Sequence, residues 1–132
     1  MTANLELFNR VFEFSQAIIG FDTYDSLPTK DVPYPFIVLD NMQDIPNNLK
    51  TDLVGRTTIT VHVWGSEDMR TEVTNALSKL ISLKEIESDN YIFQARYREH
   101  TSQTLNDTSV ANTTLIHGIA TLVFDWFKKE KG

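Results

Sequence analysis

Residues 56–64 alternate between two kinds of side chain at every position. One set is apolar or small and β-branched, and the other is polar or aromatic. Because successive side chains of a strand point to opposite faces, this period of two predicts a β-strand with one buried face. A chain with such a strand must form a sheet and cover its apolar face. The buried face would carry Thr57, Ile59, Val61 and Val63, and the other face Thr58, Thr60, His62 and Trp64.

Two segments have the spacing of amphipathic helices that could provide this cover. The first begins near Leu5, repeats its apolar side chains at intervals of three and four residues, and stops at Gly20. The second spans residues 67–81 and follows Ser66, a residue type that caps helices. The expected inward-facing side chains are Leu5, Phe8, Val11, Phe12, Ser15, Ile18 and Ile19 in the first helix, and Met69, Val73, Ala76, Leu77 and Leu80 in the second.

Three further segments are predicted strands. Residues 36–39 form a short apolar run, residues 91–100 alternate, and residues 114–127 form a long β-branched and aromatic run. Two polar stretches separate the strands. We interpret residues 41–53 as an arm or wide loop, and residues 101–112 as a polar loop that joins two long antiparallel strands.

These elements predict one α+β domain that spans the whole chain of 132 residues. Their order is helix, a proline-rich loop over residues 21–35, two strands, a second helix and two more strands. Helices on one face of an antiparallel sheet bury both apolar stripes at once. We therefore expect a mainly antiparallel sheet of about four strands with two helices packed on one face.

The net charge and the absence of cysteine exclude several classes of function. Lys and Arg number 12 against 18 Asp and Glu, and the resulting net charge of −6 argues against a sequence-reading DNA binder. Without cysteine there are no disulfides, thiolate metal sites or cysteine nucleophiles. No stretch approaches the ~20 apolar residues of a membrane span, so we expect a cytosolic protein without membrane contact.

The sequence carries no catalytic motif. The five glycines never cluster into a phosphate-binding loop, no Gly-x-Ser-x-Gly is present, and no lysine follows an acidic residue by two positions, as restriction-type nucleases require. The histidines lack the spacing of metal ligands. His62 and His117 lie in predicted strands, where we expect them to face solvent or a neighbouring tyrosine. We expect no catalytic residue, cofactor or metal.

Six aspartates in the first half of the chain could bind Mg²⁺ or Ca²⁺. Their spacing matches no EF-hand loop, and three of them stand within two residues of proline or asparagine, as turn residues do. A solvated acidic rim is the favoured interpretation, and an enzyme that uses these carboxylates is a distant third among the possible functions. They are Asp22, Asp25, Asp31, Asp40, Asp44 and Asp52.

Four motifs stand out along the first half of the chain. They are Tyr-Asp-Ser-Leu-Pro from residue 24, Pro-Tyr-Pro-Phe-Ile-Val-Leu from residue 33, Asp-Ile-Pro-Asn-Asn-Leu-Lys-Thr from residue 44, and Thr-Val-His-Val-Trp from residue 60. Together they resemble the tail-completion proteins of long-tailed bacteriophages, also called tail terminator or tail-to-head joining proteins. The chain length, both predicted helices and the closing strand pair agree, so the resemblance covers nearly the whole chain.

The resemblance implies a non-enzymatic virion protein. Family members form a hexameric ring at the head-proximal end of the tail tube, stop tube growth and dock to the head connector. The implied partners are further copies of the chain, the tail tube protein and the head connector or completion protein. DNA would pass through the lumen without specific binding, past a wall made repulsive by the acidic charge. The implied location is the virion tail, and the host cytoplasm during assembly.

Two polar segments are long enough to serve as assembly arms, since hairpin loops usually have ~2–5 residues. Exposed polar segments can become ordered on a neighbouring subunit, and a ring needs a contact between two different patches. The candidate assembly interface consists of Asp44, Ile45, Pro46, Asn47, Asn48, Lys50, Thr101, Ser102, Gln103, Thr104, Leu105, Asn106 and Asp107.

The alternative from a different class is a small α+β binding module or inhibitor that acts on one cellular protein partner. A ring protein forms hexamers that depend on concentration or on a partner, whereas an inhibitor forms a small complex of fixed size. A mass measurement therefore separates the two.

Overall fold

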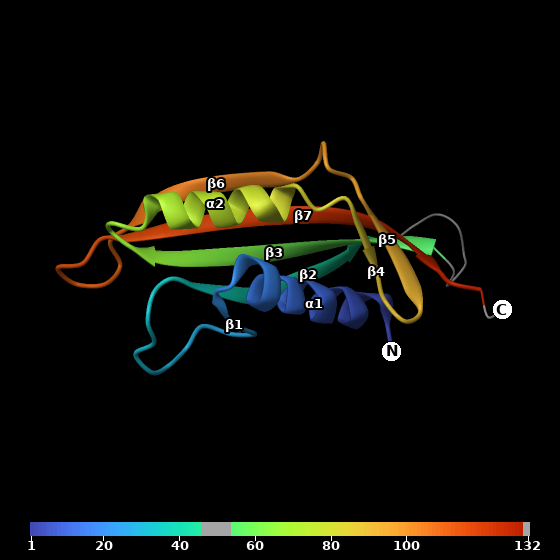
Figure 1. The fold of residues 1–132 in the computed structure, drawn as a ribbon, viewed down its shortest axis with the longest axis horizontal. Helices are drawn as coiled ribbons and strands as arrows, with labels where there is room; N and C mark the ends of the chain where they lie inside the picture. The colour runs from blue at the N-terminus through green and yellow to red at the C-terminus, as the bar shows by residue number, and fades with distance from the viewer. Residues whose placement is uncertain (46–53, 131–132) are drawn as a thin grey trace.

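The computed structural model describes residues 1–45 and 54–130. The chain folds into a curled, seven-stranded sheet with two α-helices (Figure 1). The α+β class is confirmed, but the sheet has more strands than expected and contains one parallel pair. The elements are α1 (Ala3–Phe14), the π-helical segment η1 (Ser15–Ile19), β1 (Asp22–Tyr24), β2 (Phe36–Ile45), β3 (Val54–Ser66), α2 (Arg70–Ile81), β4 (Glu85–Glu87), β5 (Tyr91–Ala95), β6 (Thr101–Asp107) and β7 (Leu115–Lys128).

β3 and β7 form the centre of the sheet. They pair antiparallel along the full length of β3, from Val54 opposite Phe127 to Ser66 opposite Leu115. The strand order is β1-β2-β3-β7-β5-β4, and β6 also pairs with β7, next to β5 on the same edge. β1 runs parallel to β2, and the other pairs are antiparallel.

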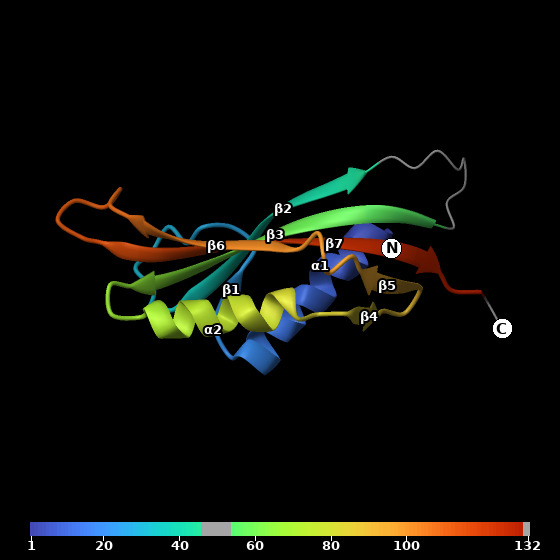
Figure 2. The same ribbon diagram turned by 90° about the horizontal axis from the view of Figure 1, so that it is seen from above.

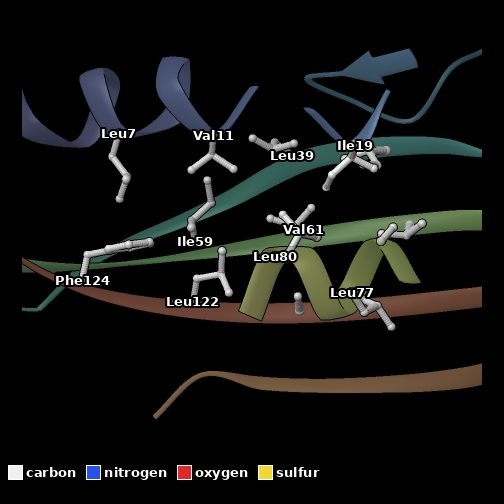
Figure 3. Packing of buried hydrophobic residues seen from close by; sticks show 14 of the residues in the cluster. Leu7, Val11, Ile19, Leu39, Ile59, Val61, Leu77, Leu80, Leu122 and Phe124 are labelled. Atoms are coloured by element: carbon white, nitrogen blue, oxygen red, sulfur yellow. The ribbon is translucent and has the colours of Figure 1, made fainter. Parts of the chain in front are cut away.

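The two helices pack on one face of the sheet, as Figure 2 shows. The alternation predicted for β3 is confirmed, because even and odd positions differ in burial from Thr57 to Ser66. The side chains that face the helices are fully buried, and those on the opposite face are partly exposed. Figure 3 shows part of this core, which includes Leu7, Val11, Leu39, Ile59, Val61, Leu77, Leu80, Leu122 and Phe124.

α1 and η1 bury part of the predicted stripe, because Val11, Ser15 and Ile19 are buried as expected. Leu5 and Ile18 were expected to face inward, but they are 46% and 61% exposed. The last helical turn widens into η1, which shifts the inward face around Ile18 relative to a regular α-helix. Gly20 ends the helical segment at a φ of 86°, as predicted. The buried residues are Ala3, Glu6, Leu7, Val11, Ser15 and Ile19.

α2 begins at Arg70, three residues later than predicted, and Ser66 does not cap it. The Ser66 hydroxyl donates to Asp68 Oδ1 at 2.6 Å, and the Ser66 carbonyl accepts from the Met69 N–H at 2.9 Å. These bonds form a turn between β3 and the helix. The predicted inward face is confirmed from the second turn onward, because the buried residues are Val73, Ala76, Leu77 and Leu80.

A buried carboxylate ties α1 to the turn between β4 and β5. Glu6 is only 6% exposed, and it accepts hydrogen bonds from the Asn90 N–H at 3.0 Å and from Asn90 Nδ2 at 2.9 Å. Burial alone would raise the pKa of Glu6, but the hydrogen bonds from Ser88 and Asn90 outweigh it and hold the pKa below its ordinary value. The ionised Glu6 side chain therefore holds α1 against the turn between β4 and β5.

Candidate assembly surface

The first half of residues 101–112, predicted as a loop, is a strand. β6 runs from Thr101 to Asp107 and contains all of the candidate interface residues of this segment. It pairs antiparallel with β7, from Thr101 opposite Thr121 to Asp107 opposite Leu115. The loop prediction is wrong here because the hydrogen-bond ladder, rather than a buried apolar face, holds β6 in place. The strand predicted over residues 91–100 correspondingly ends early, at the end of β5.

β6 forms an edge that no other strand covers within the residues that the structure describes. Edge strands of soluble proteins are usually protected by lysine, proline or a bulge. β6 has no lysine or proline, its register with β7 is continuous, and its one charged residue is Asp107. An exposed edge of this kind can accept a further strand by main-chain hydrogen bonding.

The second candidate segment begins at the end of β2. Asp44 and Ile45 are the last two residues of that strand, and they pair with Thr57 and Arg56 of β3. The Asp44 carboxylate accepts from Thr57 Oγ1 at 2.9 Å and from Asn4 Nδ2 at 3.3 Å, so it anchors the start of α1. The remaining candidates, Pro46, Asn47, Asn48 and Lys50, lie outside the described residues.

The last part of β2 has an open edge of its own. β1 pairs only with Phe36 to Val38, and in the described parts of the chain no strand covers the outer side of residues 40–45. The predicted arm is thus wrong for residues 41–45, which continue β2 beyond a bulge between Leu39 and Asn41. Figure 1 shows β6 and β2 on opposite sides of the β3–β7 pair. The structure therefore places the two candidate segments at opposite edges of one sheet.

A histidine cluster lies on the helix-free face, where we expected these side chains to meet solvent or a tyrosine. His62 Nδ1 is 2.8 Å from His117 Nε2, and His62 Nε2 is 3.2 Å from Asp40 Oδ1. Trp64 stacks on His117, with ring centroids 3.7 Å apart and an interplanar angle of 9°. The sequence could not reveal this cluster, because it depends on the register that sets Trp64 opposite His117.

The cluster links three neighbouring strands, β2, β3 and β7. Burial, and then the nearby His62, lower the pKa of His117 below its ordinary value. In the His62–His117 pair one ring nitrogen donates and the other accepts, and the Nε2 atom of His62 faces the Asp40 carboxylate. Among residues 1–45 and 54–130, no group of three or more His, Asp or Glu side chains is arranged to hold a metal ion.

An ion-pair network occupies the other end of the same face. Arg56 Nε lies 2.7 Å from Asp125 Oδ1, and Arg96 Nη1 lies 3.1 Å from Asp125 Oδ2. Burial alone would raise the pKa of Asp125, but the two guanidinium groups outweigh it and lower the pKa. Arg96 also pairs with Glu99. The arginines of this face are therefore already engaged by carboxylates.

The comparisons with known proteins support the fold and assign no family. No protein-family model and no curated protein matches the chain. Among the solved structures that match, one superimposes with a TM-score of 0.53 over 97% of this chain and 94% of its own, at 11% sequence identity. An identity this low shows a shared fold alone. In the part of the chain that the structure describes, no helix is long and apolar enough to span a membrane.

Proposed function

We propose that this chain is a non-enzymatic virion protein that caps the tail tube of a long-tailed phage as a ring, stops tube growth and joins the tail to the head connector. The observation that carries the proposal is that, in the described parts of the chain, two strand edges on opposite sides of one sheet are covered by no other strand. The motif resemblance supplies the family, and the edges supply a means of assembly. The partners are further copies of the chain, the tail tube protein and the head connector protein.

In this proposal the edge of β6 in one copy pairs with the outer edge of β2 in the next. Because the two edges differ, the contact is heterologous, and repeating it closes a ring when the rotation between copies fits. Main-chain hydrogen bonds provide affinity, and alternate side chains select the register. Gln43 of β2 and Gln103 and Leu105 of β6 are exposed and available for this contact.

The charge of the chain suits a channel for DNA. The net charge is −6, and Asp125 engages Arg56 and Arg96 on the helix-free face. A wall of this kind repels the phosphate backbone, so DNA passes without being held. This argument favours a lumen over a nucleic-acid binding groove.

The open edge of β6 also favours one alternative. A small binding module or inhibitor could use that edge to capture a strand of a single cellular protein. Such a protein needs only one edge, whereas a ring needs both. The two functions therefore differ in whether a change at the β2 edge has any effect.

The experiment is complementation of a phage that lacks the chain, with particles counted by electron microscopy. The variant Gln103→Lys with Leu105→Lys adds two positive charges to the β6 edge. Lysine side chains on an edge strand oppose pairing with a further strand. We expect separate DNA-filled heads and free tails, or tails of abnormal length. The control variant Asn75→Lys with Ser78→Lys adds the same charges at exposed positions of α2, and we expect normal particles.

Two outcomes would count against the proposal. Normal virions without the chain would exclude a tail-completion role. Full infectivity of the β6 variant, together with full infectivity of the matching variant Asn41→Lys with Gln43→Lys at the exposed β2 edge, would remove the edges from the mechanism.

A further inference from the structure

A groove of about 360 Å³ opens on the helix-free face, at the end of the sheet where β2 and β7 begin. Phe36, Trp64 and Leu115, from three adjacent strands, form its floor. One wall is the loop before β2, from Leu27 to Tyr34, and the other is the loop after β6, with Ser109 and Val110. Figure 1 shows these two loops at the same end of the molecule.

Ring stacking supports the floor of the groove. Tyr34 stacks on Phe36 at a centroid distance of 5.3 Å, and Tyr24 meets Phe36 edge-on at 5.7 Å. Trp64 lies opposite Phe36 in the ladder and rests on His117. A floor fixed in this way needs little reordering when a ligand binds, which lowers the entropic cost of binding.

The walls present apolar side chains to solvent. Leu27 is 59% exposed and Val110 is 49% exposed, and they stand on the two sides of the aromatic floor. Exposed apolar side chains gathered around a groove mark a contact site more often than scattered ones do.

Two carboxylates and one cation lie in the groove or at its margin. Asp31 lines it, and Asp107 stands at its margin, where it accepts from the Ser109 N–H at 2.9 Å and from the Ser109 hydroxyl at 2.6 Å. These bonds lower the pKa of Asp107, so the group is ionised at neutral pH. Lys30 is the one cation in the lining.

We propose that this groove docks an extended basic segment of a partner protein, with aliphatic side chains between Leu27 and Val110 and lysine or arginine side chains toward the surrounding carboxylates. Cationic side chains also bind favourably to the faces of aromatic rings, and their methylene stems pack on apolar surface. The inference goes beyond ring assembly, because it requires a single copy of the chain and does not involve strand pairing at either edge.

The first test is binding of a defined probe to the full chain. The probe is a fluorescein-labelled peptide in which lysine or arginine alternates with leucine, and the comparison peptide has glutamate in place of each cation. We expect saturable binding of the basic peptide that weakens as salt is added, and no binding of the acidic one. In two-dimensional NMR of the labelled protein, the perturbed signals should include the Trp64 indole and the Leu27 and Val110 amides.

Variants at exposed positions test the apolar contact and the charge contact separately, without affecting the core. Leu27→Ser should weaken binding about fivefold by removing an apolar contact, and Asp31→Asn should weaken it about two- to threefold. Lys30→Gln removes the opposing cation and should tighten binding by a similar factor. Ile18→Ser, at a position 61% exposed in a separate cavity beside α1, is the control and should change nothing.

Three results would overturn the proposal. Equal affinity for the acidic peptide would exclude the charge argument, and perturbed signals away from the groove would exclude the site. Absence of saturable binding at roughly 1 mM basic peptide would exclude a docking function of useful strength. Each of these results would leave the assembly of copies through the strand edges intact, so the two proposals fail independently.

Discussion

Gly118 of β7 lies directly beneath Leu77 of α2. A Cβ atom built on Gly118 would come within 2.8 Å of Leu77 Cδ1 and of Val73 Cγ1, which is inside van der Waals contact. A Cβ atom built on Gly65, on the adjacent strand β3, would likewise come within 2.7 Å of Val73 Cγ2. The absence of side chains at these two positions therefore sets how closely α2 approaches the sheet.

We predict that Gly118→Ala lowers the free energy of unfolding by about 1–3 kcal/mol, because the added methyl overpacks this contact. Leu77→Ala alone should cost about 2–5 kcal/mol by leaving a cavity. The double variant should cost less than the sum, because the new methyl enters the vacated space. Urea unfolding measures all three values. The losses in unfolding free energy from Gly118→Ala and from Leu7→Ala on α1 should add. A coupling energy between Gly118 and Leu7 as large as that between Gly118 and Leu77 would contradict the account.

Glu6 gives a second prediction. Glu6→Gln replaces a buried acceptor of two hydrogen bonds with an amide whose donor meets another donor, and it should cost about 1.5–3 kcal/mol. The folded-state pKa of Glu6 is lowered, so its contribution is present above the unfolded pKa of about 4.3 and is lost as the pH falls. Glu13→Gln, where the carboxylate is exposed and pairs with Arg10, should stay within about 0.5 kcal/mol. Urea unfolding at pH 7 and pH 4 measures both variants. Equal losses of unfolding free energy for Glu6→Gln and Glu13→Gln would exclude a stabilising role of the buried Glu6–Asn90 hydrogen bonds.

Histidine burial predicts a loss of stability in mild acid. The pKa values of His100 and His117 are both lowered, mainly by burial, so the folded state favours their neutral forms. Stability is then complete above the unfolded pKa of about 6.5 and falls as the pH drops through the folded values. His117→Gln should reduce the fall in melting temperature between pH 7 and pH 5. Ser78→His, which adds an exposed histidine on α2, should leave the slope of the wild type unchanged, and a slope unaffected by His117→Gln would contradict the assignment.

The engaged arginines predict weak DNA binding. By fluorescence anisotropy at ~50 mM salt, duplex DNA should bind no tighter than the ~10⁻⁴–10⁻⁶ M of ordinary non-specific binders. Asp125→Asn removes the ion pair of Arg56 and one of the two ion pairs of Arg96, and it should strengthen binding. Asp25→Asn makes the same change in net charge at an exposed loop and should not strengthen it. Tight, strongly salt-dependent binding by the wild type would indicate a basic face, with Arg98 and Lys128 as its first candidates.

Burial on one face made part of the fold predictable. β3 was found because Ile59, Val61 and Val63 alternate with polar side chains, and that alternation follows directly from the helices that cover one side. The inward face of α2 was found for the same reason. β1 and β4, at three residues each, are too short to display any period. In α1, the change to π-helical geometry at Ser15 leaves no mark in the spacing of apolar residues.

β6 shows what a pattern of side chains cannot predict. Its residues are mostly exposed and polar on both faces, so no alternation marks it as a strand, and only its pairing with β7 defines it. Length and polarity did single out the segment as a candidate interface. The open edge, and its position opposite the edge of β2, required the strand order. The groove near Trp64 depends in the same way on loops that are distant in sequence.

The natural absence of cysteine allows a direct test of the two-edge contact. Gln43→Cys on β2 and Gln103→Cys on β6 place one thiol on each exposed edge, and either substitution alone provides one edge only. Phage particles assembled with each variant would be oxidised, denatured and separated by mass on a gel. The account predicts a ladder of cross-linked species up to the hexamer for the double variant and monomers for both single variants. Dimers from Gln103→Cys alone, or uncross-linked monomers from particles that contain the double variant, would contradict it.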